Sequence, residues 1–301
     1  MIDKPDTTDT NLAVAEVPPH YSEFKRVVRV FFGRPLAVIG FVIIALLVIT
    51  AVFAPLLAPY DPYKRDLPAK LQQPNSEHLL GTDALGRDTL SRIIYGSQTS
   101  LVIGIVAVGA ATIIGQFLGV VASYFGGIIY AIIMRFIDAL MSIPPILIAL
   151  VIASIVGSGL SNVIMAVGVG MIAPQARVMC GQALSIKQND YVLIGRAMGA
   201  SDARIIVRYI LPNSFPPLIV LATMQVGAAI LLEAGLSFLG IGISAPGAAW
   251  GSMVNDGYRY LLTHPMLSVA PGVAIMLVVF GFNMMGDGLR DALDPRFRGI
   301  L

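Results

Sequence analysis

Charged residues are scarce in this sequence. Only 13% of its 301 residues are Asp, Glu, Lys or Arg, whereas a soluble domain carries about a quarter. Hydrophobic residues make up 56% of the chain, and the mean hydropathy is +0.80. This composition predicts an integral membrane protein. The net charge of +2 gives no reason to expect a nucleic-acid partner.

Cysteine and histidine are also rare. Cys180 is the only cysteine, which excludes an internal disulfide and indicates a small packing residue in an apolar run. The three histidines, at positions 20, 78 and 264, have no metal-ligand spacing. The sequence also lacks a phosphate-binding G-x-x-x-x-G-K-[ST] loop and a nucleophile with a suitable partner. We therefore expect no catalysis by this chain, and no metal or cofactor bound to it.

Long apolar runs are what the sequence has instead. Each is long enough to cross about 30 Å of hydrocarbon as a helix, so we predict an all-α, polytopic fold with six transmembrane helices. The predicted spans are 36–58, 100–122, 128–153, 162–184, 213–239 and 266–285. In the second, Gly115 and Gly119 form a small-xxx-small pattern that permits close helix approach. In the third, Pro144 and Pro145 predict a kink or a locally opened helix.

Basic residues set the predicted orientation. Lys25, Arg26, Arg29 and Arg34 precede the first span, and most of the 20 Lys and Arg residues fall on the same side of the six-span arrangement. Positive residues favour the cytoplasmic side, so both termini are predicted to lie inside. No cleavable signal peptide is expected, because the first apolar run is too long.

These spans divide the chain into four predicted segments. Residues 1–24, rich in Asp, Thr and Pro, are expected to form a disordered cytoplasmic tail. A basic juxtamembrane segment and the first span occupy 25–58, and an outside, periplasmic loop occupies 59–98. The remainder, 99–301, is a five-span core with a cytoplasmic loop at about 187–212.

Three groups of ionisable residues are candidates for function. Arg135 and Asp138, near the inner end of the third span, can neutralise each other on one helix face, which favours a structural pair over a transport role. Glu233, near the outer end of the fifth span, either lines a wet path or hydrogen-bonds to a neighbouring helix. The charges at 83–88 either bind a ligand or an ion or, as we favour, form a salt-bridged helix start at the surface.

A charged stretch at 190–213 separates the fourth and fifth spans on the predicted cytoplasmic face. It predicts two short helices, 191–198 and 201–210, with a break at Gly199 and with Pro212 closing the second helix. By itself this pattern is typical of an amphipathic interfacial loop. A helix-turn-helix is rejected, because the flanking spans would fix it against lipid.

The second of these short helices has clear signals. Ser201 is expected as its N-cap, and Asp202 lies in its first turn, where a carboxylate faces the positive end of the helix dipole. Arg204 and Arg208 lie one turn apart and are expected to project together.

This stretch resembles the conserved cytoplasmic loop of bacterial ABC-importer permeases. That pattern is E-A-A, three residues, Gly, nine residues and I-x-L-P. Gly199, Leu211 and Pro212 match in position, whereas Leu-Ile-Gly at 193–195 replaces the E-A-A triplet and Tyr209 replaces the first Ile.

Three further runs are similar to the C-type permease subunit of dipeptide and oligopeptide importers, a family that also includes nickel transporters. They are LGTDALGRDTLSR at 80–92, EAGLSFLG at 233–240 and GDGLRDALDP at 286–295. Together these runs extend the resemblance over nearly the whole chain from about residue 24.

The resemblance implies an ABC-importer permease fold in the bacterial cytoplasmic membrane. This subunit would pair with a second, related permease, two ATPase subunits would dock on the cytoplasmic side, and an extracytoplasmic solute-binding protein would deliver peptide. ATP and Mg²⁺ would be bound by the partner subunits. The two helices around Gly199 would insert into a groove on an ATPase subunit. The expected docking residues are Leu193, Arg196, Ala197, Met198, Gly199, Ala200, Ser201, Asp202, Arg204, Ile205 and Arg208.

Several alternatives stay open. Relatives in this family carry nickel chelates, glutathione or cationic peptides. A secondary transporter should show inverted repeats and coupling-ion carboxylates near the midplane, but we find no convincing repeat, and Glu233 lies too near the outer end. A purely structural membrane subunit is the third alternative. Arg135, Asp138, Pro144 and Pro145, like Glu233, are candidates for either the translocation path or a structural role.

Overall fold

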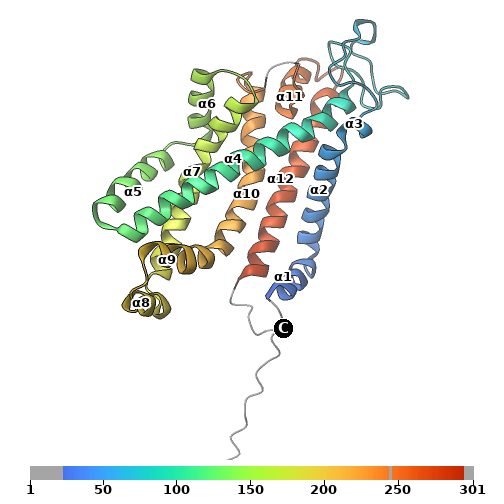
Figure 1. The fold of residues 1–301 in the computed structure, drawn as a ribbon. Helices are drawn as coiled ribbons and strands as arrows, with labels where there is room; N and C mark the ends of the chain where they lie inside the picture. Colours follow the sequence, from blue (N-terminus) through green and yellow to red (C-terminus); the bar gives the residue numbers. More distant parts are fainter. Residues whose placement is uncertain (1–22, 244–245, 295–301) are drawn as a thin grey trace, which may run out of the picture.

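The computed structural model describes residues 23–243 and 246–294, and every regular element within those ranges is a helix (Figure 1). The predicted tail at 1–24 lies almost wholly outside these ranges. Five helices are long and apolar enough to cross a membrane, and a sixth span exists if one bent pair of helices is counted. The five are α2 (Pro35–Val52), α4 (Thr89–Phe125), α7 (Leu160–Ile186), α12 (Met266–Leu293) and the helix that begins at Asp202 and includes α10 (Leu211–Phe238). The predicted all-α fold is confirmed.

The bent pair consists of α5 (Gly127–Met141) and α6 (Pro145–Val156), and it replaces the third predicted span. The two axes differ by 90°. Pro144 caps the start of α6 in an extended conformation, with ψ of 134°, and Pro145 is its first residue. Proline has no N–H to continue a helix ladder, and it disfavours a helical residue before it. The predicted kink is therefore confirmed, and it is a complete break between two helices.

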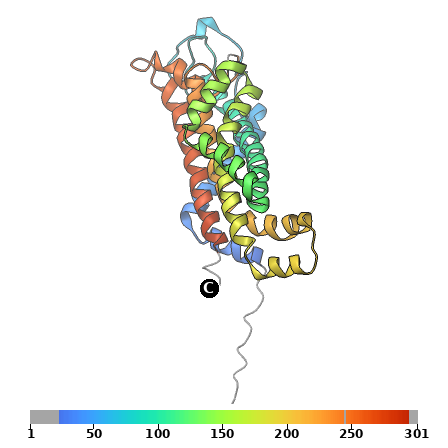
Figure 2. The same cartoon turned by 90° about the vertical axis from the view of Figure 1, so that its left-hand side faces the viewer.

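Shorter helices lie at the two ends of the bundle. One end, which we call the α8 end, carries α1 (Glu23–Phe32), α8 (Asp190–Ala197), α9 (Asp202–Ile205) and the last turn of α12 (Figures 1 and 2). The opposite end, the α11 end, carries α11 (Trp250–Tyr258) and the segment 54–88, which begins with α3 (Ala54–Leu57) and includes the 3-10 turn η1 (Leu67–Ala69). Both described ends of the chain thus lie at the α8 end.

Close packing of α4 against α7 forms the centre of the bundle. A Cβ at Gly115 would lie 2.6 Å from the Cβ of Gln175, and one at Gly119 would lie 2.5 Å from the carbonyl oxygen of Ala176. Neither distance is compatible with a larger side chain, so the predicted small-xxx-small contact is confirmed. Beside it, α4, α6, α7 and α10 share a cluster of buried apolar residues that includes Ile103.

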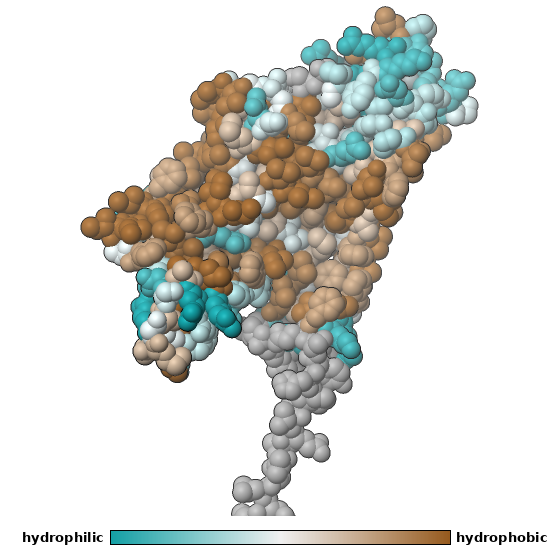
Figure 3. All heavy atoms as spheres, in the orientation of Figure 1, coloured by the Kyte–Doolittle hydropathy of each residue, from teal (hydrophilic) through white to brown (hydrophobic). Residues whose placement is uncertain are grey.

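On the face shown in Figure 3, a hydrophobic band lies between two more hydrophilic ends. Large apolar side chains of α4 and α6 are exposed, among them Ile113, Phe117 and Ile155. Apolar surface of this extent is unfavourable in water and suits contact with lipid or with another membrane subunit.

At the α11 end, the predicted salt-bridged helix start is present but is not at the surface. Asp88 caps α4 by accepting a hydrogen bond from the backbone N–H of Ser91 (2.8 Å), and Arg87 Nε lies 2.6 Å from Asp83 Oδ2. Arg87 and Asp88 are nevertheless buried. The segment before α4 folds over them, and Tyr60 N–H donates to Ser91 Oγ (3.1 Å). The helix itself begins at Thr89, earlier than the expected span.

Candidate functional site

The predicted pair of short helices at 190–210 forms a hairpin that projects from the α8 end (Figure 2). We call it the α8–α9 hairpin. The break falls at Gly199, which has φ of +81°, a conformation that costs other residues free energy. The N–H of Ala200 donates to the carbonyl oxygen of Gly195 (3.1 Å) and closes the end of α8. The predicted position of the break is confirmed.

The start of α9 is as expected, but its end is not. Ser201 Oγ accepts a hydrogen bond from the backbone N–H of Arg204 (3.4 Å), and Asp202 lies in the first turn. Pro212 does not close the helix. Instead a π-helical turn, η2 (Ile206–Ile210), leads directly into α10, where Pro212 occupies the first turn. A wide turn relieves the clash of the proline ring with the preceding turn, and a helix start does not need the missing N–H.

The inner face of the hairpin is anchored in the bundle by apolar side chains. Val192 from α8 and Ile205 from α9 are buried in a cluster with Tyr124 of α4, Met179 of α7 and Leu218 of α10. The prediction that Ile205 contacts an outside partner is therefore wrong. Ile205 lies one turn after the N-cap, on the side of α9 that faces the bundle. Its role is to hold the hairpin to three long helices.

A polar network around Tyr124 reinforces this anchor. The Tyr124 hydroxyl donates to Asp202 Oδ1 and accepts a hydrogen bond from Arg196 Nη2 (3.1 Å). Lys187 Nζ, at the end of α7, donates to the carbonyl oxygen of Tyr124 (2.7 Å) and lies 5.3 Å from the ring centroid. Two docking candidates, Arg196 and Asp202, are thus partly committed to internal contacts.

The sequence analysis missed Tyr124 and Lys187, although each lies where a predicted span ends. The hydrogen bond from Arg196 to the Tyr124 hydroxyl also raises the pKa of the arginine further above its usual value, so its charge is retained. The network links the ends of α4 and α7 to both helices of the hairpin.

The outer face of the hairpin combines exposed apolar residues with basic ones. Met198 is 76% exposed, and Leu193 and Ile194 are more than half exposed. Ala197, Arg204 and Arg208 are also exposed, and Ala200 is half-buried. Ile194 was not among the predicted docking residues. An exposed apolar patch flanked by arginines suits a partner with an apolar groove and an acidic rim.

The predicted charge pair on the third span has a different partner. Asp138 on α5 forms an ion pair with Arg177 on α7, not with Arg135. Sequence spacing pointed to the neighbour on the same helix, but α7 packs beside α5 and brings Arg177 closer. Arg177 and Asp138 keep 43% and 51% of their side-chain surface exposed, and Arg135 is also exposed. Arg177 lies well inside α7, whereas Asp138 lies in the last turn of α5.

Glu233 lies in the interior of the bundle. Its side chain is fully buried, and its Oε1 accepts a hydrogen bond from Ser237 Oγ (2.7 Å) on the next turn of α10. Its Oε2 has no partner among the described residues. Within that part of the chain, no three His, Cys, Asp or Glu residues form a group that could hold a metal ion.

Comparisons with known proteins agree with this geometry. Residues 111–299 match the family described as binding-protein-dependent transport system inner membrane component, and residues 22–74 match the N-terminal TM domain of oligopeptide transport permease C. Over 99% of this chain and 97% of the relative, the sequence is 38% identical to the dipeptide transport system permease protein DppC of Alkalihalophilus pseudofirmus.

Two further relatives and one solved structure are also similar. Identity is 43% to the probable D,D-dipeptide transport system permease protein DdpC of Escherichia coli, over 89% of this chain and 90% of that protein. It is 41% to the glutathione transport system permease protein GsiD of Pectobacterium atrosepticum, over 90% of each. A chain of the MetNI methionine ABC transporter, in an inward-facing form, has the same fold, with a TM-score of 0.56 and 20% identity over 67% of this chain and 96% of that one.

Proposed function

Because this chain belongs to the C-type permease subunits of dipeptide and oligopeptide ABC importers, multi-pass proteins of the bacterial inner membrane, we propose that it carries di- or oligopeptides inward, driven by partner ATPase subunits. It is a transport subunit, not an enzyme. In this proposal ATP and Mg²⁺ bind to two ATPase subunits at the α8 end. A solute-binding protein delivers peptide at the α11 end.

The outer face of the α8–α9 hairpin supports the docking of an ATPase most directly. Met198, Leu193 and Ile194 are large apolar side chains exposed on α8 and at its end, and an apolar patch of neighbouring side chains is typical of an interaction site. Arg204 and Arg208 are exposed on the following segment and suit an acidic rim. We place the ATPase on this face and the bundle on the opposite, buried face of the hairpin.

The buried contacts of the hairpin would couple movement of the ATPases to movement of the membrane-spanning helices. Ile205 and Val192 pack on α4, α7 and α10, and η2 continues into α10 without a loop. Closure of the ATPases would move the hairpin as one body, and these helices with it. The gate between the two faces of the membrane would open through that movement.

A second permease subunit is expected on the face formed by α5 and α7. Asp138 and Arg177 are half exposed there, and Arg177 lies well inside α7. A charge pair at membrane depth is costly against lipid, so this face would meet protein or a water-filled path. This arrangement agrees with a translocation path between two related permeases.

Orientation follows from the positions of basic residues. Arg196, Arg204 and Arg208 lie at the α8 end, as does α1 with its basic side chains. Basic residues favour the cytoplasmic side, so we assign the α8 end to the cytoplasm and the α11 end to the periplasm.

The relatives suggest two classes of solute. Two of them are named as dipeptide or D,D-dipeptide permeases, which favours short peptides, and one is named as a glutathione permease. Glutathione is therefore the second candidate. Competition between labelled dipeptide and unlabelled glutathione for uptake distinguishes them, because only the true solute should compete at a concentration near its own KM.

The test is uptake into proteoliposomes that contain the complete complex. Labelled dipeptide should accumulate when ATP is supplied on the hairpin side and the binding protein on the other, with proton and sodium gradients abolished. Uptake that follows a gradient and ignores ATP would instead support an ion-coupled secondary transporter.

A further inference from the structure

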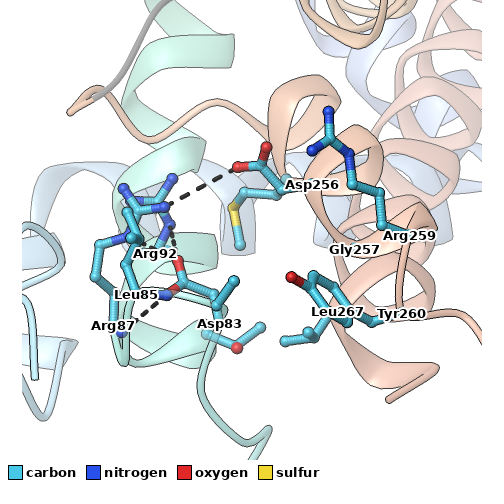
Figure 4. Close-up of a pocket in the computed structure, with 12 residues that line it drawn as sticks. Asp83, Leu85, Arg87, Arg92, Asp256, Gly257, Arg259, Tyr260 and Leu267 are labelled. Atoms are coloured by element: carbon cyan, nitrogen blue, oxygen red, sulfur yellow. Dashed lines mark hydrogen bonds and ion pairs between the residues drawn. The ribbon is translucent and has the colours of Figure 1, made fainter. Parts of the chain in front are cut away.

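A small cavity at the α11 end is lined by arginines from two parts of the chain. Its volume is about 170 Å³. Figure 4 shows Asp83, Arg87 and Arg92 on one wall, from the start of α4 and the segment before it. Asp256, with the neighbouring residues of α11 and its following turn, forms the other wall. Asp83 and Arg87 belong to the charged run 83–88, for which the sequence leaves ligand or ion binding as the alternative to a salt-bridged helix start.

Positive charge exceeds negative charge deep in this cavity. Arg87 and Arg92 are 4% and 2% exposed, and both approach a single carboxylate oxygen, Asp83 Oδ2, at 2.6 and 3.8 Å. The next carboxylate, Asp256, is 4.0 Å from Arg87 Nη2, and its side chain is 62% exposed. Arg259 adds a third guanidinium to the lining. Two buried guanidinium groups therefore share one half-buried carboxylate.

Among the residues that the structure describes, hydrogen bonding in the cavity is also incomplete, with long contacts at Arg92 and an unpartnered hydroxyl at Thr89. Arg92 has five N–H donors, yet its contacts within the described chain are long: 3.8 Å from Nε to Asp83, and 3.4 Å from Nη1 to the carbonyl oxygen of Pro62. Thr89, which is 1% exposed and lines the same cavity, has a hydroxyl with no partner among the described residues. Buried donors of this kind are normally paired, so the wall is incomplete without an acceptor.

We propose that this cavity is a carboxylate-binding subsite, which receives the C-terminal carboxylate of an entering peptide; for the identity of the solute, the inference rests on the proposed function. The guanidinium fork matches a carboxylate in two parallel hydrogen bonds, and the Thr89 hydroxyl supplies a further donor. A water molecule needs only about 10–15 Å³ of such volume, so the cavity admits a carboxylate together with the adjoining atoms. A small solute fits better than a protein side chain, because the guanidinium groups are almost fully covered.

The test uses the purified complex of the full chain with its partner subunits, without the solute-binding protein. The probes are acetate, dialanine and dialanine C-terminal amide, and binding is followed by saturation-transfer NMR. Dialanine should bind at least about tenfold more tightly than its amide, and acetate should compete with it. Equal binding of acid and amide would overturn the subsite.

Substitutions localise the effect. Thr89→Val keeps the size of the side chain and removes only the hydroxyl, and Arg259→Gln changes an exposed residue, so both should fold. Each should weaken dialanine binding by about three- to tenfold and leave amide binding unchanged, and Arg92→Lys should weaken it by at least about tenfold. Lys70→Gln, which removes an exposed charge at the same end, is the control and should change binding less than about twofold. Unchanged binding in both Thr89→Val and Arg259→Gln would contradict the assignment.

The two levels of the proposal fail separately. If ATP drives dipeptide uptake but acetate and dialanine do not bind at this cavity, the subsite is wrong and the importer assignment stands. If acetate binds and loses affinity in the variants while no peptide is transported, the subsite stands and the peptide solute is wrong. If the variants impair only the docking of the solute-binding protein, the cavity serves that protein and the proposal is overturned.

Discussion

The two ends of the bundle differ in whether their arginine side chains are exposed or buried. At the α8 end, Arg204 and Arg208 are exposed and an apolar residue, Ile205, provides the buried anchor. At the α11 end, Arg87 and Arg92 are buried around a small cavity. An exposed apolar and basic face suits a macromolecule that brings its own complementary surface. Enclosed donors suit a small group that must be stripped of water.

The largest effect should come from the anchor of the hairpin. Ile205→Ala removes buried methyl groups from the cluster at the ends of α4, α7 and α10 and should cost about 2–5 kcal/mol of stability. Met198→Ala, on the exposed face, should change stability by less than about 0.5 kcal/mol and should weaken ATPase binding instead. Thermal unfolding in detergent and ATPase co-purification measure the two effects. A reversed pattern would mean that the inner and outer faces are exchanged.

The turn between α8 and α9 should be next in sensitivity. Gly199→Pro replaces a residue with φ of +81° by one fixed near −65°, which should cost about 3 kcal/mol locally and abolish ATPase co-purification. Gly199→Ala should be intermediate, because a left-handed conformation costs alanine only about 1–3 kcal/mol. Normal ATPase binding by the proline variant would show that the turn does not position the docking face.

Removing the Tyr124 hydroxyl should leave the binding of the ATPases intact but weaken the coupling of ATP hydrolysis to peptide uptake. Tyr124→Phe keeps the ring beside Lys187 but loses the hydrogen bonds to Asp202 and Arg196, at a cost of about 1–3 kcal/mol. Hydrogen exchange of the α9 amides should accelerate, and peptide uptake per ATP hydrolysed should fall while the ATPases stay bound. Tyr130→Phe, an exposed tyrosine on α5, is the matched control and should leave both unchanged.

Charge reversal on the exposed face should have the smallest effect. Arg204→Glu and Arg208→Glu should each weaken ATPase association by about 1 kcal/mol, since charges at the rim of an interface remain hydrated. The loss should shrink as salt is raised, whereas that of Met198→Ala should not. If neither charge reversal changes the affinity for the ATPase at low salt, the two arginines lie outside the interface.

The positions of the spans and of the hairpin were predictable because they depend on local signals. Apolar length identified the spans, Pro144 and Pro145 marked the break in the third, and Ser201 marked the start of α9. Each signal acts within a few residues of where it stands.

Which side chains point into the bundle, and which partners they meet, could not be predicted in the same way. Ile205 and Met198 are both apolar residues of the hairpin, so hydrophobicity alone did not reveal that Ile205 faces inward and Met198 outward. The partner of Asp138, Arg177, depends on how α5 packs against α7. The burial of Arg87 depends on how the segment before α4 folds over it. The continuation of α9 into α10 required a π-helical turn that sequence periodicity does not show.

Cross-linking tests most directly whether the ATPase subunits dock on the α8–α9 hairpin. Cys180 is the only cysteine, so Cys180→Ala gives a background in which one new thiol is unique. Met198→Cys and Leu262→Cys place that thiol at opposite ends of the bundle. The native Met198 and Leu262 are 76% and 99% exposed, so a thiol at either position is accessible. A bifunctional maleimide should join the ATPase subunit to the thiol at 198 and not to that at 262. Capture at 262 but not at 198 would contradict the account.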